Sequence, residues 1–168
     1  QKLAQEVNGS LKCTWEEREI DLEGPWKRLS VKNAVIDVAG QSERVFDDPA
    51  VAAEAAIDCG ANPDDVIRAL LEPLTGEQVV DLARDVGCTG LDDLVKAFAR
   101  PDDRPKITRG AVDRYADEET GRVRAGHIGF MIFEEKVEAD LVQPTFLVDF
   151  PLAISPLARK KDSDPAFC

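Results

Sequence analysis

Residues 144–151 constrain the fold most, because they form an apolar strand bounded by proline at both ends. Between Pro144 and Pro151 the chain is TFLVDF, a run rich in β-branched and aromatic residues. Such residues favour strands, whereas proline is tolerated mainly at strand ends and sheet edges. The near-continuous apolar character is typical of a strand buried on both faces of a larger sheet. The sequence therefore predicts a strand over residues 145–150 that needs neighbouring strands.

The segment after this strand is stiff and ends in positive charge. Pro156 fixes its own backbone dihedral and favours an extended Ser155, and Arg159, Lys160 and Lys161 follow closely. The net charge of the chain is −12, but residues 41–103 hold fifteen acidic against five basic residues. Because phosphates are bound by basic side chains, a nucleic acid, if this chain binds one, is expected at the basic end of this loop and not at the acidic middle.

The middle of the chain is predicted to be a series of short helices. Proline at the first helical position after Asn62, and Thr75 ahead of another apolar helical pattern, are typical N-terminal signals. Each helix is too short to be stable alone, so we expect a small bundle with a shared core. Residues 100–106, with two prolines and alternating charge, indicate a linker, and a break is expected at Gly121.

The remaining segments predict a mixture of strands and helices. Residues 10–15 and 18–22 form a credible hairpin, and Ser30 is a plausible N-cap for a helix over residues 31–39. Apolar residues at helical spacing predict another helix over residues 127–141. Trp15 and Trp26 are expected to pack against the sheet.

No complete active site is visible in the chain. The four cysteines form no C-x-x-C pair, His127 stands alone among glycines, and there is no glycine-rich phosphate loop. Adjacent acidic pairs such as Glu134-Glu135 point to different faces of a helix and do not form an acid–base dyad. We therefore predict no catalytic, ATP-binding or metal-binding residue here. No apolar run approaches membrane-spanning length, and a cytoplasmic protein with reduced thiols is expected.

The segments QPTFLVDFP and SPLARKKDSDP, in this order and register, resemble class II lysyl-tRNA synthetases between signature motifs two and three of the catalytic domain. The segments EIDL and PWKRLS near the start resemble the same family. The resemblance implies an α+β fold, a fragment of the antiparallel-sheet catalytic domain with a mainly helical insertion. Residues 1–40 and 120–168 would then belong to the catalytic core. Residues 41–119, which match poorly, would form an acidic helical insertion.

For the full-length enzyme the resemblance implies activation of lysine with ATP and Mg²⁺, transfer to tRNA(Lys), and a homodimer without membrane association. The residues of motifs two and three are expected before Gln1 and after Cys168, so no catalytic residue is carried over and the chain alone should be inactive. One loop is a candidate border of the tRNA acceptor entrance, with a rigid connector as the alternative: Ser155, Pro156, Leu157, Ala158 and Arg159. Asp149 is expected to be a structural hydrogen-bond partner rather than a lysine ligand.

Two other functions remain open. One is a non-catalytic, synthetase-derived binding module that uses the acidic helices as a partner surface. The other is a synthetase-like ligase that modifies a protein lysine. An upstream oligonucleotide-binding barrel and a downstream motif three in the gene would favour the tRNA enzyme. Since the expected strands need partners outside the chain, we also expect the isolated chain to be marginally stable or self-associating.

Overall fold

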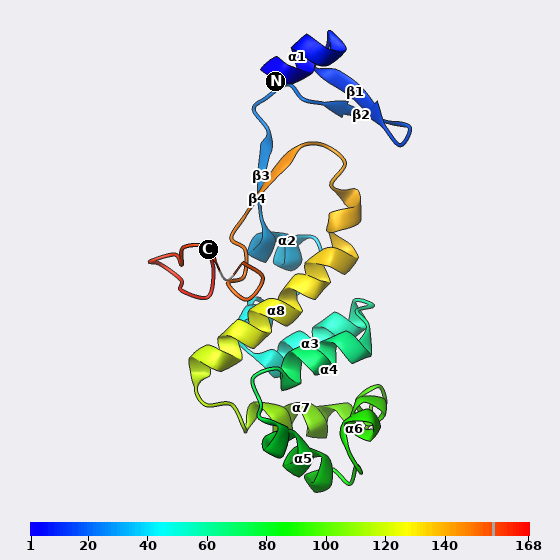
Figure 1. The fold of residues 1–168 in the computed structure, drawn as a ribbon, viewed down its shortest axis with the longest axis vertical. Coiled ribbons are helices and arrows are strands. Elements are labelled where there is room, and N and C mark those ends of the chain that lie inside the picture. Colours follow the sequence, from blue (N-terminus) through cyan, green and yellow to red (C-terminus); the bar gives the residue numbers. More distant parts are fainter. Residues whose placement is uncertain (156) are drawn as a thin grey trace.

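A computed structural model describes residues 1–168 except residue 156. The molecule is elongated, with a helical body and a narrow arm that contains the N-terminus (Figure 1). The arm contains α1 (Lys2–Asn8), β1 (Lys12–Trp15), β2 (Arg18–Asp21), β3 (Lys27–Ser30) and β4 (Thr145–Val148). The body contains α2 (Val31–Asp37), η1 (Glu43–Phe46), α3 (Pro49–Asp58), α4 (Pro63–Leu71), α5 (Gly76–Asp85), α6 (Leu91–Phe98), α7 (Arg104–Val112), α8 (Glu118–Lys136) and η2 (Glu138–Asp140). The chain is thus of mixed α and β structure, as predicted.

Most of the predicted helix starts are confirmed by side-chain caps. The Ser30 hydroxyl accepts a hydrogen bond from the amide of Asn33, and Asp48 caps α3 through the amides of Ala50 and Val51. Thr75 and Gln78 form a reciprocal capping box at the start of α5. Such caps satisfy amides that have no partner within the helix, which explains why these short sequences are helical at these places.

The hydrophobic core lies in the helical body. Its largest fully buried side chains include Phe46, Phe98 and Phe133, and no described residue before Val31 is buried. Helix α3 packs along α8, the longest helix, while α4 and α7 pack against α3. The core is thus shared among the helices, and Leu29 of β3 and Leu147 of β4 pack against it from the base of the arm.

Three glycines along α8 allow other segments to approach it closely. A methyl group added at Gly129 would lie 2.8 Å from Cε1 of Phe46, and one added at Gly126 would lie 3.1 Å from Cβ of Pro151. The third, Gly121, faces Pro49 at the start of α3. The expected break at Gly121 is therefore wrong: this glycine lies inside α8, where the absence of a side chain permits close packing.

The predicted linker over residues 100–106 is also wrong. Helix α7 begins at Arg104, which is only 6% exposed. Its guanidinium donates hydrogen bonds to the carbonyl oxygens of Phe98 and Ala99 and to Oε2 of Glu54. Arg104 thereby satisfies carbonyls at the end of α6, and the polar composition of this segment belongs to a buried contact rather than to an exposed connection.

The arm contains two separate two-stranded sheets among the described residues. Strands β1 and β2 form the predicted antiparallel hairpin, with Lys12 opposite Asp21. Strands β3 and β4 are parallel, with Lys27 opposite Thr145. The prediction that Trp15 packs against the sheet is wrong, since this side chain is 69% exposed. The indole of Trp26 lies 5.3 Å from the ring of Phe146, measured between centroids.

The strand predicted over residues 145–150 is shorter and less buried than expected. It ends at Val148, because Asp149 adopts a left-handed backbone with φ of 58°. Phe146 is 51% exposed, so within this chain the strand is not covered on both faces. The division into residues 1–40, 41–119 and 120–168 stays a prediction, and its second boundary falls in the first turn of α8.

Candidate functional site

The candidate loop belongs to a longer segment, residues 149–168, which we call the C-terminal strap. The strap folds back on itself: the amide of Leu152 donates to the carbonyl oxygen of Ala166 at 2.8 Å, and the amide of Cys168 to that of Phe150 at 2.9 Å. Phe167 is buried in the core of the body, where its ring centroid lies 5.5 Å from that of Phe46. The base of the loop is therefore fixed to the helical body.

The loop itself projects into solvent. The amide of Ser155 donates to the carbonyl oxygen of Leu152, and the carbonyl oxygen of Ser155 accepts from the amide of Ala158 at 2.9 Å. Leu157 is fully exposed and Ala158 is exposed. The side chain of Arg159 is 88% exposed and lies 3.8 Å from the equally exposed carboxylate of Asp162. Pro156 lies outside the described residues. Among its described residues the loop thus presents the apolar side chains of Leu157 and Ala158 and the cation of Arg159 beyond its anchored base.

The two lysines that follow the loop are held by carboxylates elsewhere in the same chain. Nζ of Lys160 lies 3.1 Å from Oε1 of Glu119, at the start of α8, and Lys161 forms an ion pair with Asp149. Asp149 is therefore engaged in an internal contact, as expected for a structural partner. Arg159 is the cation of this cluster that is most available to an external anion, because its pair with Asp162 is exposed and screened by water.

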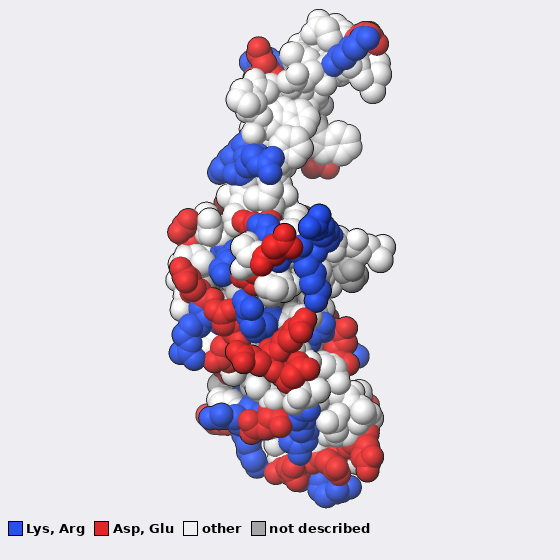
Figure 2. Space-filling view, turned by 90° about the vertical axis from the view of Figure 1, so that its left-hand side faces the viewer, with Lys and Arg blue, Asp and Glu red and all other residues white. Residues whose placement is uncertain are grey.

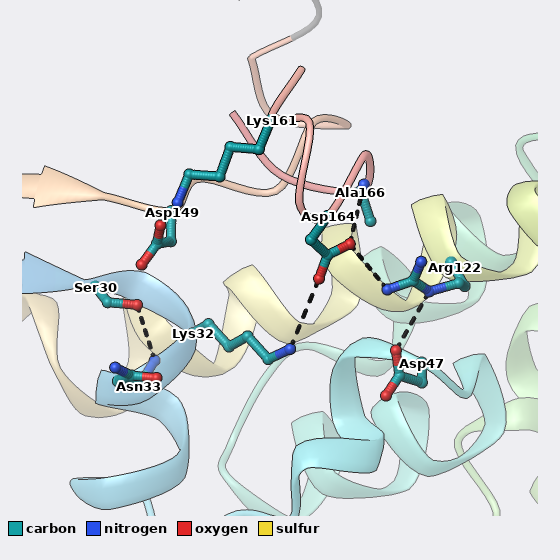
Figure 3. A network of polar contacts seen from close by, with 9 residues as sticks. All are labelled: Ser30, Lys32, Asn33, Asp47, Arg122, Asp149, Lys161, Asp164 and Ala166. Atoms are coloured by element: carbon teal, nitrogen blue, oxygen red, sulfur yellow. Dashed lines mark hydrogen bonds and ion pairs between the residues drawn. The ribbon is translucent and has the colours of Figure 1, made fainter. Parts of the chain in front are cut away.

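A network of half-buried charges holds the strap against three parts of the body (Figure 3). Asp164 accepts hydrogen bonds from Nη2 of Arg122 at 3.0 Å and from the amide of Ala166 at 3.3 Å, and Nζ of Lys32 lies 3.9 Å away. Nε of Arg122 also donates to Oδ1 of Asp47. Sequence reasoning missed this network because 42 and 75 residues separate Arg122 from its two partners, and no local spacing signals such contacts.

The histidine of the chain, His127, lies on α8 one residue after Gly126, which closely approaches Pro151 of the strap. Its Nδ1 is 3.6 Å from Oε2 of Glu72, which also forms an ion pair with Arg124. Burial and the positive charge of Arg124 lower the pKa of His127, and Glu72 opposes them only in part. A neutral imidazole in this setting is a packed polar side chain, and catalysis would need an orienting partner and a nucleophile.

The histidine, cysteine and acidic side chains of the described residues do not cluster into a metal site, since no group of three or more of them is placed to hold a metal ion. The four cysteines are free thiols, and burial raises the pKa of Cys59 and that of Cys88. In the part of the chain that the structure describes, none of the helices is long and apolar enough to cross a membrane.

Comparisons with known proteins identify relatives over almost the whole chain. No family model matches it. A lysine–tRNA ligase of Staphylococcus haemolyticus is 30% identical over 165 residues, which is 98% of this chain and 22% of that protein. The lysine–tRNA ligases of Clostridium perfringens strain 13 and of Thermoanaerobacter pseudethanolicus are 30% and 26% identical, with the same coverage.

These similarities relate the chain to the aminoacyl-tRNA ligases. Within that class it corresponds to a segment of the lysine–tRNA ligases, which confirms the resemblance seen in the sequence. The chain spans about a fifth of the length of these relatives.

Proposed function

We propose that this chain forms part of the catalytic domain of a cytoplasmic lysine–tRNA ligase, which activates lysine with ATP and transfers it to tRNA(Lys). The observation that carries this proposal is the similarity to lysine–tRNA ligases over 98% of the chain. The segment lies between signature motifs two and three, and the full-length enzyme acts as a homodimer. Residues 41–119 form an acidic helical insertion within that domain.

The exposed surface of the arm supports a place within a larger domain. Leu3 and Val7 on α1 are each 72% exposed, and Phe146 and Trp15 are also solvent-accessible. On the face seen in Figure 2, uncharged residues cover much of the arm. A parallel pair of strands is normally covered on both faces and continued at its edges, so β3 and β4 fit the interior of a larger sheet. We assign the missing strands to the rest of the ligase.

Binding of ATP and Mg²⁺ is assigned to other parts of the ligase. The described residues offer no ligand group that fits a magnesium ion, and the sequence has no glycine-rich phosphate loop. The isolated chain is therefore expected to be inactive. A lysine-dependent ATP–pyrophosphate exchange assay tests this expectation: the chain alone should give no turnover, and clear turnover would contradict the proposal.

The loop of residues 155–159 is proposed to border the entrance for the acceptor end of tRNA. Its anchored base and the exposed guanidinium of Arg159 fit a contact to a phosphate. In a ligase that contains this segment, Arg159→Ala should raise KM for tRNA about threefold to tenfold, while lysine-dependent pyrophosphate exchange stays unchanged. Lys96→Ala, which removes an exposed cation of α6, is the control and should change neither quantity. An unchanged KM for tRNA in Arg159→Ala would favour the rigid connector instead.

A non-catalytic binding module is the second candidate, and one observation favours it. The fully buried core lies in the helical body, and Lys160 and Lys161 are paired with carboxylates of the same chain, which fits a protein-binding body without RNA contact. The coding sequence on both sides of this segment tests this alternative. An upstream oligonucleotide-binding barrel with a downstream motif three favours the tRNA ligase.

A ligase that modifies a protein lysine would be recognised by transfer of lysine to protein but not to tRNA.

A further inference from the structure

A groove of about 830 Å³ is lined by residues of α3, of α7 and of the first turn of α8. Helix α3 packs against both α7 and α8 in the body (Figure 1), and the start of α8 also contacts the C-terminal strap through the Lys160–Glu119 ion pair. Pro49, Ala50 and Val112 give the groove apolar walls, and the ring of Tyr115 also lines it. A volume of this size is in the range of sites that bind small molecules or peptide side chains.

Two oxygen atoms in residues that line this groove are buried and lack a hydrogen-bond partner. They are Oγ1 of Thr108 and Oε1 of Glu54. Thr108 is only 2% exposed, and it follows Arg104 by one helical turn, on the face of α7 that meets α3. The other carboxylate oxygen of Glu54 accepts a hydrogen bond from Nη1 of Arg104 at 3.1 Å. Buried polar atoms without partners cost free energy, so this pair points to a missing hydrogen-bond donor.

The charge of the groove defines the donor. Acidic side chains outnumber basic ones among the lining residues: Asp47, Asp48, Glu54, Asp117 and Glu118 against Arg44 and Arg109. Three of these acids already have a cation, because Asp48 pairs with Arg44, Glu54 with Arg104 and Asp47 with Arg122. The remaining charge of the groove is that of Asp117 and Glu118 against Arg109. The surrounding region, residues 41–103, also carries a strong excess of acid. A ligand with a positively charged donor group is therefore attracted, and an anionic ligand is repelled.

We propose that this groove binds an alkylguanidinium or alkylammonium group, as carried by a small amine or by an arginine or lysine side chain of a basic peptide. The charged group donates hydrogen bonds to Oε1 of Glu54 and Oγ1 of Thr108, and the aliphatic stem packs against Pro49 and Val112. This site is separate from the proposed activation of lysine, because free lysine adds a carboxylate that the acidic rim repels.

The proposal is tested by titrating the 168-residue chain with agmatine, with the tripeptide acetyl-Gly-Arg-Gly-amide and with L-lysine, followed by calorimetry and amide NMR shifts. Agmatine or the tripeptide should bind saturably and shift the amides of α3 and α7, and L-lysine should bind more weakly than both. Tighter binding of agmatine would indicate a small amine as the natural ligand, and tighter binding of the tripeptide would indicate an arginine side chain of a peptide. If neither agmatine nor the tripeptide binds saturably up to about 10 mM, the proposal is wrong.

Two variants separate the site from the general charge of the region. Thr108→Val removes the unpaired hydroxyl, so the free protein should be equally or more stable, yet binding should weaken about tenfold, as expected for loss of a hydrogen bond to a charged group. Glu54→Gln should also weaken binding. Glu77→Gln removes an exposed acid of α5 outside the groove and should leave the affinity nearly unchanged. Unchanged binding in Thr108→Val, or equal loss in Glu77→Gln, would contradict the proposed site.

Discussion

At the scale of single residues, Arg104 shows how a charged side chain can be a structural part of the core. Its guanidinium lies over the ring of Phe98 and satisfies two carbonyl oxygens where α6 ends. The sequence around it could not reveal this role, because the partner Glu54 is fifty residues away and the local composition is that of a linker. Nearby prolines were compatible with α7 because Pro105 occupies its first turn, where a missing amide costs little.

Replacement of this arginine tests its structural role. Arg104→Met keeps much of the aliphatic bulk but leaves the carbonyls of Phe98 and Ala99 buried without donors. The free energy of unfolding should fall by about 2–3 kcal/mol, measured by urea denaturation. Arg109→Met, at an exposed position on the same helix, should change it by less than about 0.5 kcal/mol. Equal effects of the two substitutions would show that the buried hydrogen bonds do not matter.

His127 makes stability depend on pH near neutrality. Burial, together with Arg124, lowers the pKa of its imidazole in the folded protein. As the pH falls from about 7.5 to about 5.5, the unfolded chain takes up a proton that the folded chain resists, so the folded state loses stability. Urea denaturation at both pH values should show this loss, and His127→Gln should reduce it, since this is the only histidine of the chain. An identical pH dependence in the variant would exclude His127 as the cause.

At the scale of elements, the sequence predicted where the helices of the middle region begin. It did not predict that the segment between α6 and α8 forms helix α7 or that α8 continues through Gly121. Caps such as Asp48 and Thr75 act within a few residues, so local sequence contains the whole signal. The glycines of α8 have the opposite property. Gly126 and Gly129 look like helix breakers locally, but their function is to admit Pro151 and Phe46 from distant segments.

This packing makes Gly129 sensitive to the smallest substitution. Alanine normally favours a helix over glycine by about 1 kcal/mol. In Gly129→Ala the new methyl group meets the fully buried ring of Phe46, and overpacking should lower the free energy of unfolding by about 1–3 kcal/mol instead. Gly76→Ala is the matched control, because nothing lies within 4 Å of the position of its Cβ. Thermal and urea unfolding of both variants would reveal the difference, and a stabilised Gly129→Ala would refute this account of the contact.

At the scale of the whole molecule, the arm and the body differ in how completely they are packed. The apolar run of β4 predicted a strand with neighbours on both sides; in the structure β4 pairs with β3 and Phe146 is half exposed, so partners outside this chain stay a prediction. The sequence also placed the candidate loop after that strand. It could not indicate the charge network of Asp164 or the groove between α3 and α7, since both are formed only when distant segments meet in the folded chain.

The exposed arm predicts association of the isolated chain. Leu3 and Phe146 present apolar surface that has no cover in a monomer. Sedimentation velocity should show concentration-dependent self-association of the wild-type chain, and the double substitution Leu3→Glu with Phe146→Glu should shift it towards monomer. Leu91→Glu changes an exposed leucine of the body and should leave association unaltered. A wild-type chain that stays monomeric at all concentrations would contradict this prediction.

Asp47 connects the groove to the C-terminal strap, because its carboxylate takes part in both. It lines the groove and also accepts a hydrogen bond from Arg122, which holds Asp164 in the C-terminal strap. A cation that draws the carboxylate of Asp47 towards the groove weakens its hold on Arg122. Thermodynamic reciprocity then requires that occupancy of the groove and engagement of the loop alter each other's affinity by the same factor.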